Sequence, residues 1–309
     1  MSINKPKFVC IGAPKSGTTS LYHYLSQHPG IFLPKKKELH FFSRKQIADR
    51  IMGPKDAYAL DGCPKSDCEY LDLFSSLKEG QIGGDISPSY FSNNLCFEDM
   101  KAFLGTPKII IILRNPVDKA YSQYMHLVRE GRETLSFEDA IDAEDERVAQ
   151  RYSDFWQYRS SGLYSNIVSR AISIFGKHNV GVFFQEELRS SPQKTLRKIC
   201  EFIEVEDIRF SVTTEYNKSG VPKSMYLSKL FSPGPFLRFS KLLIPYSVGV
   251  AIKNFIMELN TGKKITLSNQ TRASLANYYA KDVASLNSFI NVPEAWSDFS
   301  LNPEEGDHS

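Results

Sequence analysis

A short loop near the start of the chain combines glycine, lysine and hydroxyl side chains in a pattern that suits anion binding. Lys15 lies between Gly12 and Gly17, after an apolar run at residues 7–12 and before a helical pattern at residues 17–27. The free N–H groups and the dipole of a helix N-terminus favour negative charge, and a lysine adds a mobile positive charge. The loop therefore predicts a phosphate or sulfate site. Its candidate binding residues are Lys15, Ser16, Gly17, Thr18, Thr19 and Ser20.

The same loop differs from the Walker A loop of ATP- and GTP-hydrolysing enzymes. Walker A has the form G-x-x-x-x-G-K-[ST], but here Thr18 follows Gly17 and the lysine lies inside the loop as Lys15. A clear Walker B acid is also missing, because the most apolar run ends in Arg114. These differences count against an ordinary nucleotide kinase or NTPase. A turn that merely caps a helix is the alternative without a ligand.

A second anion-binding group is predicted at the end of that apolar run. Residues 108–114 read KIIIILR, and five consecutive aliphatic residues are typical of a central parallel strand that is buried on both faces. Arg114 would then lie at the carboxyl end of the strand, where open α/β sheets bind ligands. A guanidinium matches phosphate geometry with two parallel hydrogen bonds. A surface ion pair is the alternative role for Arg114.

The elements that would position these residues alternate along the chain. Strands are expected at residues 7–12, 83–87, 108–114 and 180–184. Helices are expected at residues 17–27, 115–129, from 136 onward, and at 164–176, 191–203 and 269–289. This alternation predicts an α/β fold with a mainly parallel sheet, in a single domain over residues 1–309. Prolines interrupt residues 211–267, which we interpret as a lid, an acceptor wall or an irregular surface insertion.

Composition excludes several classes of protein. With 41% hydrophobic and 24% charged residues, the chain is an ordinary globular protein and not a disordered one. A net charge of +3 provides no general basic surface for nucleic acid, although a local anion site is compatible with it. Cys63 and Cys68 form a C-x4-C pair for which a disulfide is one hypothesis. Because no second Cys/His pair has ligand spacing, a zinc site is not expected.

Hydropathy predicts a protein without a membrane span. No long apolar stretch opens the chain, and Pro245 and Lys253 interrupt residues 242–256, its longest apolar region. A spanning helix needs about 20 apolar residues. We therefore expect no signal peptide and no transmembrane segment, and we predict a cytoplasmic protein. Contact of residues 236–256 with a membrane surface is a minority hypothesis, and the sequence predicts no oligomeric state.

Two motifs together resemble those of sulfotransferases, which use 3′-phosphoadenosine 5′-phosphosulfate (PAPS) as sulfuryl donor. Residues 14–21, P-K-S-G-T-T-S-L, resemble the family's 5′-phosphosulfate loop. Residues 114–124 resemble the family's strand ending R-[ND]-P, with a following helix that carries R-A-x-S-x-Y. Arg114 and Ser122 match the two positions that grip the donor's 3′-phosphate, and Lys119 stands where the family often has arginine. The resemblance implies a P-loop-containing nucleotide-binding fold with a central mainly parallel sheet and flanking helices.

A third block resembles that of family members acting on carbohydrates. Residues 37–42, K-E-L-H-F-F, are similar to their K-E-x-H-F-F block, whose glutamate is the proposed catalytic base. This resemblance implies that Glu38 is the base, with Leu39 where the family often has proline. His40 is either a structural histidine, a second candidate base or an acceptor ligand, and Lys37 could orient the donor sulfate or Glu38.

The resulting prediction is an enzyme that moves a sulfuryl group from PAPS to an acceptor hydroxyl by in-line displacement. The acceptor would be a carbohydrate or another small-molecule or lipid-linked alcohol. An acid or imidazole must take the acceptor's proton, and Lys15 would neutralise charge on the leaving nucleotide. No metal is required, since Lys15, Arg114 and backbone amides can meet that charge. A nucleotide kinase or a non-catalytic nucleotide-binding module are the alternatives.

Overall fold

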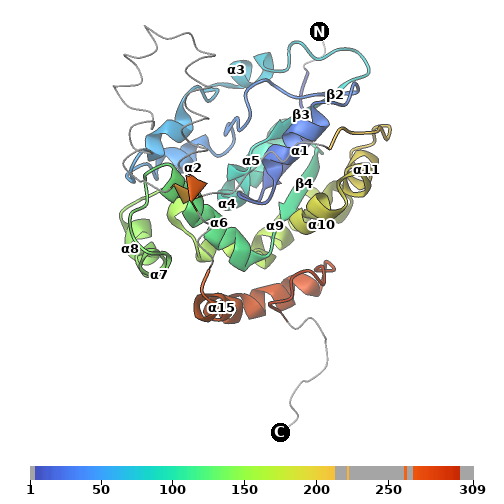
Figure 1. The fold of residues 1–309 in the computed structure, drawn as a ribbon. Coiled ribbons are helices and arrows are strands. Elements are labelled where there is room, and N and C mark those ends of the chain that lie inside the picture. Colours follow the sequence, from blue (N-terminus) through green and yellow to red (C-terminus); the bar gives the residue numbers. More distant parts are fainter. Residues whose placement is uncertain (1–3, 213–220, 223–260, 263–266, 300–309) are drawn as a thin grey trace.

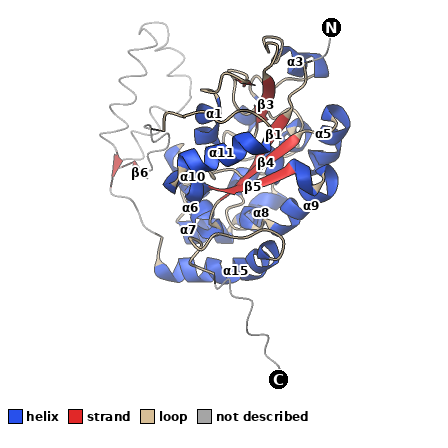
Figure 2. Cartoon of the chain, turned by 90° about the vertical axis from the view of Figure 1, so that its right-hand side faces the viewer, coloured by secondary structure: helices blue, strands red, loops and turns tan. Residues whose placement is uncertain are grey.

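The computed structural model of the chain describes residues 4–212, 221–222, 261–262 and 267–299. A central sheet lies in the middle of these residues, and helices cover both of its faces (Figure 1). In the view turned by 90°, α10 (Gln185–Ser190) and α11 (Pro192–Phe202) lie to one side of the strands, and α5 (Phe97–Leu104) and α9 (Ser165–Phe175) lie to the other (Figure 2). The predicted α/β fold with a parallel sheet is confirmed.

Five parallel strands form the central sheet. They are β1 (Phe8–Gly12), β2 (Ile31–Phe32), β3 (Ile82–Ile86), β4 (Lys108–Leu113) and β5 (Val180–Phe184), in the order β2-β3-β1-β4-β5. After β1 the chain continues towards β2 and β3, whereas after β4 it continues towards β5 on the other side. The carboxyl ends of β1 and β4 therefore form a topological switch point, which is where open α/β sheets bind their ligands.

The two faces of the sheet belong to two separate hydrophobic clusters. Phe8 and Cys10 pack with residues of α1 (Thr18–Leu25), α10 and α11, while Val9 and Ile11 pack with residues of α5, α6 (Pro116–Arg129), α9 and α15 (Asn269–Asn287). This division follows from the two-residue period of a strand. Residues 109–113 of β4 are fully buried, as their aliphatic run predicts.

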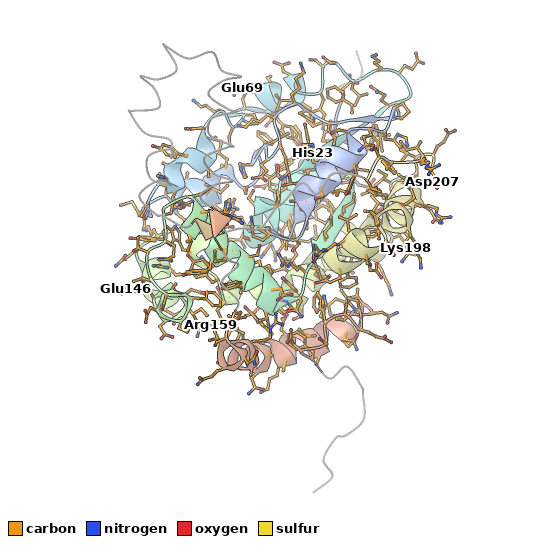
Figure 3. The ribbon with its side chains drawn as sticks, viewed as in Figure 1. His23, Glu69, Glu146, Arg159, Lys198 and Asp207 are labelled. Carbon is orange, nitrogen blue, oxygen red and sulfur yellow. The ribbon has the colours of Figure 1, made fainter. Side chains whose placement is uncertain are left out.

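The remaining described helices are short. They are α2 (Arg44–Ala48), α3 (Asp67–Asp72), α4 (Ser89–Ser92), α7 (Phe137–Asp142) and α8 (Glu144–Ala149), with 3-10 turns η1 (Asp56–Leu60), η2 (Asn94–Cys96), η3 (Asp154–Trp156), η4 (Ser160–Gly162) and η5 (Lys177–Asn179). Figure 3 places Glu146 of α8 and Lys198 of α11 on opposite sides of the molecule, with the sheet between them. Two short strands, β6 (Val221–Pro222) and β7 (Thr261–Gly262), pair antiparallel outside the main sheet.

The predicted elements are all present, and their capping signals act as the sequence indicates. The side chain of Asn115 accepts a hydrogen bond from the Val117 N–H at 3.0 Å, and the hydroxyl of Ser136 accepts one from the Asp139 N–H at 3.2 Å. The two-residue strand β2 and the short helices between β2 and β4 were not predicted. Most of residues 211–267 and all of residues 236–256 lie outside the described residues, so the lid and membrane-contact hypotheses stay predictions. Cys63 and Cys68 are free thiols.

Candidate active site

The predicted anion loop lies at the switch point, between β1 and α1. Gly12 ends β1, and a Cβ at this position would lie 2.6 Å from the Cβ of Phe91, so only glycine fits. Gly17 is the N-cap of α1 with a φ of 98°, a conformation that favours glycine. Because Gly17 has no side chain to cap the helix, the N–H groups of the first turn of α1 are left for a ligand.

Arg114 joins the second motif to this loop. Its Nη1 donates a hydrogen bond to the carbonyl oxygen of Lys15 at 3.3 Å. The hydroxyl of Tyr164, which is fully buried, donates to the carbonyl oxygen of Arg114 at 2.9 Å and supports the end of β4 from the other side. Two motifs separated by a hundred residues therefore meet because β1 and β4 are neighbours in the sheet.

The two other predicted positions of the second motif lie on α6. Ser122 is on its second turn and is partly buried, and its contact with a 3′-phosphate stays a prediction. Lys119 is fully buried, and its Nζ donates to the carbonyl oxygen of Ser161 at 2.9 Å and to the Ser161 hydroxyl. Burial lowers the pKa of Lys119 to about 7. Lys119 therefore anchors the η4 turn, and its contact with a 3′-phosphate stays a prediction.

The surroundings of Lys15 disfavour its positive charge as long as no anion is bound. Burial lowers the pKa of its ammonium to about 8, and the positive charges of Arg129 and Arg114 act in the same direction, against Glu130 and Glu38. Arg129 and Glu130 lie at the C-terminal end of α6, where no motif in the sequence indicates a role in the site. A bound phosphate or sulfate would offset this excess of positive charge.

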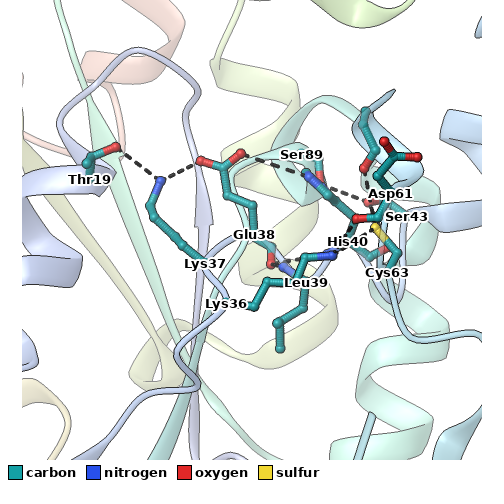
Figure 4. A network of polar contacts seen from close by, with 12 residues as sticks. Thr19, Lys36, Lys37, Glu38, Leu39, His40, Ser43, Asp61, Cys63 and Ser89 are labelled. Carbon is teal, nitrogen blue, oxygen red and sulfur yellow. Dashed lines mark hydrogen bonds and ion pairs between the residues drawn. The ribbon is translucent and has the colours of Figure 1, made fainter. Parts of the chain in front are cut away.

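The K-E-L-H-F-F block lies beside the loop and brings the candidate base to it. Figure 4 shows the chain of polar contacts: Lys37 Nζ donates to Thr19 Oγ1 at 3.1 Å and to Glu38 Oε1 at 2.5 Å. On the far side of the carboxylate, Glu38 Oε2 lies 3.9 Å from His40 Nε2. The other nitrogen of His40, Nδ1, lies 2.7 Å from the Ser89 hydroxyl. Thr19 of the anion loop and the two candidate bases thus belong to one network.

Glu38 and His40 differ in the solvent exposure of their side chains. The side chain of Glu38 is 39% exposed, whereas the side chain of His40 is 11% exposed. Burial raises the pKa of Glu38, but Lys37, His40 and Lys15 outweigh it, so that the pKa lies below its usual value. Burial also lowers the pKa of His40, against the attraction of Glu38. The accessible carboxylate is therefore charged at neutral pH, and the imidazole beside it is neutral.

A buried carboxylate holds the backbone of this block in place. Asp85, at the end of β3, accepts hydrogen bonds from the hydroxyls of Ser87 at 2.6 Å, Tyr90 at 2.8 Å and Tyr70 at 3.1 Å. The Ser87 oxygen in turn accepts from the N–H of Leu39 at 2.8 Å. Burial raises the pKa of Asp85 to about 6, although its three donors lower it. Asp85 and Tyr90 are therefore structural supports of this block.

The backbone at the site is strained in a way that fits a functional role. Six described residues other than glycine have a left-handed φ, and they include Lys15 at 63°, Glu38 at 63° and His40 at 54°. Such conformations are costly for residues with side chains and concentrate at functional sites. All three residues proposed from the sequence as catalytic are among these six. No local sequence pattern signals this strain.

Metal binding and membrane insertion have no candidate within the part of the chain that the structure describes. No three His, Cys, Asp or Glu side chains lie together there in a group that could hold a metal ion. Within the same residues, every helix is too short or too polar to cross a bilayer.

Comparison with known proteins identifies the family. The family model of the sulfotransferase family matches residues 6–209, and the chain belongs to this family. A sulfotransferase from Alicyclobacillus acidocaldarius, known as a crystal structure, is similar with a TM-score of 0.75 and 31% identity, over 95% of this chain and 99% of that chain. The fold is accordingly the P-loop-containing nucleotide-binding fold that the motifs imply. Family membership favours sulfuryl transfer over the nucleotide kinase that the sequence also allowed.

Two curated relatives match over part of their length. A membrane-associated sulfotransferase of Dictyostelium discoideum, kil1, is 33% identical over 119 residues, which are 38% of this chain and 22% of that protein. Mouse heparan sulfate glucosamine 3-O-sulfotransferase 3A1 is 27% identical over 198 residues, which are 64% of this chain and 45% of that protein. The chain thus matches less than half the length of either relative.

Proposed function

We propose that this protein transfers the sulfuryl group of PAPS to a hydroxyl group of an acceptor. The observation that carries the proposal is the hydrogen bond from Arg114 to the carbonyl oxygen of Lys15. It joins the loop suited to a 5′-phosphosulfate and the arginine suited to a 3′-phosphate at one switch point of the sheet. A nucleotide with anionic groups at both ends fits such a pair, whereas ATP has no 3′-phosphate for Arg114 to bind.

The donor would be held at its two charged ends. Arg114 and Ser122 would bind the 3′-phosphate, and Arg114 can do so through two parallel hydrogen bonds. The 5′-phosphosulfate would accept hydrogen bonds from the first turn of α1, where the dipole favours negative charge. The residues in this second group are Lys15, Ser16, Gly17, Thr18, Thr19 and Ser20.

The reaction would be an in-line displacement at sulfur. The acceptor oxygen forms a bond to sulfur while the bond from sulfur to the bridging oxygen of the nucleotide breaks, which leaves 3′-phosphoadenosine 5′-phosphate (PAP). Glu38 would take the acceptor's proton, because its carboxylate is charged and the more accessible of the two candidate bases. Lys15 would neutralise the charge that grows on the bridging oxygen. His40, next to Glu38, is the second candidate.

The proposed acceptor is an alcohol of a carbohydrate or a related molecule. The similarity to a mouse sulfotransferase named for heparan sulfate glucosamine supports this class. The K-E-L-H-F-F block supports it as well, since Glu38 stands where the glycan-directed members have their base. We also propose that transfer proceeds without a metal ion and that the protein is cytoplasmic.

Isothermal titration with PAP, ATP and ADP in the presence of a metal chelator tests the donor site. We expect tight binding of PAP, weak binding of ATP and ADP, and at least tenfold weaker PAP binding by Arg114→Ala, since a charge-assisted hydrogen bond is worth about 1.5–3 kcal/mol. A preference for ATP would favour the kinase. Tight PAP binding without sulfate transfer to any of a panel of glycans and alcohols would favour a non-catalytic module.

A further inference from the structure

Lys37 contacts both the anion loop and the candidate base Glu38. The function proposed above assigns it no part in binding the donor or in deprotonating the acceptor. Its ammonium lies between Thr19 Oγ1, at 3.1 Å, and Glu38 Oε1, at 2.5 Å (Figure 4). Only 17% of the Lys37 side chain is exposed. If Lys37 were only one of several surface lysines in this segment, its ammonium would extend into water. This one is folded back against the first turn of α1.

The position of the ammonium is unfavourable for a cation without an anion beside it. Thr19 is the second residue of α1, so Lys37 Nζ lies at the N-terminal, positive end of the helix dipole. Lys15 adds positive charge to the same loop. The carboxylate of Glu38 is the anion that Lys37 contacts here. A sulfuryl group bound at this helix end would bring three further oxygens, which share one negative charge, to the same place.

The contact with Lys37 also makes Glu38 a weaker base. Burial raises the pKa of Glu38, but the charge and hydrogen bond of Lys37 lower it below its usual value, with smaller contributions from His40 and Lys15. One carboxylate oxygen is occupied by the ammonium at 2.5 Å. A base works best with a free lone pair and a pKa near the operating pH. When the Lys37 ammonium moves away, the pKa of Glu38 rises and a lone pair becomes free, so Glu38 becomes a stronger base.

We propose that Lys37 binds the sulfuryl oxygens of the donor in exchange for its contact with Glu38, and that this exchange frees Glu38 to accept the acceptor's proton. The inference rests on the proposed function. No proton moves to or from Lys37 in the exchange. The acceptor's proton goes to Glu38, the bond from acceptor oxygen to sulfur forms, and the bond from sulfur to the bridging oxygen breaks. The base thus becomes competent only when a sulfuryl group is in place.

Of the two preceding lysines, Lys35 provides the matched control. Lys36 is engaged by other partners, since its Nζ donates to the carbonyl oxygen of Asp61 at 2.8 Å and lies 3.9 Å from Cys63 Sγ, and its charge still acts on His40. Lys35 is exposed. Lys35→Met removes the same charge as Lys37→Met, two positions away on the same segment. Lys37→Arg keeps the charge and tests whether a cation alone suffices.

The first test compares the affinity for PAPS with that for PAP, by titration without acceptor so that the donor is not consumed. For Lys37→Met we expect PAPS binding to weaken about 10- to 100-fold, the range of one or two charge-assisted hydrogen bonds, while PAP binding changes less than threefold. Lys35→Met should bind both nucleotides as the unmodified protein does. Equal weakening of PAPS and PAP binding by Lys37→Met, or no weakening of either, would overturn the proposal.

The second test is the pH profile of kcat/KM, which reports the free enzyme. Without the Lys37 charge the pKa of Glu38 rises, since burial then acts against His40 and Lys15 alone. The acidic limb of the profile should therefore move to higher pH in Lys37→Met and stay in place in Lys37→Arg and Lys35→Met. With PAPS as the varied substrate, an acidic limb that does not move in Lys37→Met would contradict the contact between Lys37 and Glu38 in the free enzyme, from which the exchange starts. A purely structural role would lower the rate at every pH alike.

Failure of this inference can be told apart from failure of the proposed function. If the unmodified protein binds neither PAPS nor PAP, the proposed function itself fails. If it binds both and Lys37→Met behaves like Lys35→Met, the donor site stands and only the role of Lys37 is wrong. Thermal unfolding of each variant, measured alongside, shows whether a loss reflects misfolding.

Discussion

At the scale of single residues, Lys15 carries a charge at a position where burial opposes it. Its pKa is lowered to about 8 by burial and by Arg129 and Arg114. Below that pH the ammonium is charged, and above it an increasing share of the protein has a neutral Lys15. A bound phosphosulfate favours the charged form and raises the pKa again. Donor affinity and Lys15 protonation are therefore linked.

This linkage predicts an alkaline limit to donor binding. The affinity for PAP should fall above about pH 8, where free Lys15 loses its proton. Titrations of PAP from pH 6.5 to 9.5 measure this directly. Lys15→Arg, whose guanidinium stays charged over that range, should remove the decline. A decline of the same size in Lys15→Arg would mean that another group is responsible.

Glu38 and His40 can be separated as candidate bases by exchanging each for a neutral glutamine, which cannot take up the proton. Glu38→Gln keeps the size of the side chain but removes the base, and we expect kcat to fall 10²- to 10⁴-fold, roughly the range of general base catalysis. His40→Gln loses a buried partner of Ser89 and should cost less if His40 only orients Glu38. Steady-state rates with PAPS and an accepted alcohol provide the comparison. A larger loss in His40→Gln would assign the base to the histidine.

At the scale of elements, the site depends on the contact between β3 and the segment that follows β2. The Ser87 hydroxyl donates to Asp85 and accepts from the N–H of Leu39, so it fixes the backbone between the left-handed residues Glu38 and His40. The anion loop makes no use of Ser87. Ser87 therefore supports the segment that carries the candidate bases.

Replacement of Ser87 should separate catalysis from donor binding. In Ser87→Ala the Leu39 N–H and Asp85 each lose a partner, and a misplaced base can cost about 10²-fold in rate. We expect kcat to fall 10- to 100-fold while PAP binding stays within threefold. Ser75→Ala, a change of an exposed serine, is the control. If PAP binding in Ser87→Ala weakened as much as kcat fell, the two parts of the site would not be independent.

The elements that the sequence predicted are those with strong local signals. The aliphatic run of β4, the Asn115 cap of α6 and the Ser136 cap of α7 each stand out within a few residues, and all three are confirmed. The two residues of β2 and the short helix α4 are held by tertiary contacts, and so no local pattern revealed them. The same distinction between local signals and tertiary contacts applies to the residues of the candidate site. Motifs indicated Lys15, Arg114 and Glu38, but the role of Ser87 depends on a partner 48 positions away.

At the scale of the whole molecule, the proposed donor site is supported by α15, which is distant in sequence. Asp282 of α15 accepts hydrogen bonds from the N–H groups of Tyr164 at 2.7 Å and Ser165 at 3.2 Å, and thus caps α9, which has no side-chain cap of its own. The Tyr164 hydroxyl in turn supports the carbonyl group of Arg114. Asp282 is thus connected through Tyr164 to the arginine proposed to bind the 3′-phosphate.

This connection predicts that one change on α15 affects both stability and donor binding. Asp282→Ala removes charged acceptors from a helix N-terminus, and we expect the free energy of unfolding to fall by about 2–3 kcal/mol. Urea unfolding measures this as a lower midpoint at an unchanged m value. Lys281→Ala, an exposed change on the same helix, should stay within about 0.5 kcal/mol of the unmodified protein.

PAP binding by the folded Asp282→Ala variant then tests whether the cap matters for function. Since Tyr164 begins the α9 segment that Asp282 holds, loosening it should release the support of Arg114 and weaken PAP binding several-fold. Tyr164→Phe removes the hydroxyl alone and should weaken binding by a similar factor with a smaller loss of stability. If Asp282→Ala is destabilised but binds PAP normally, the cap serves the fold only. If both variants bind weakly, the last described helix of the chain is part of the donor site's architecture.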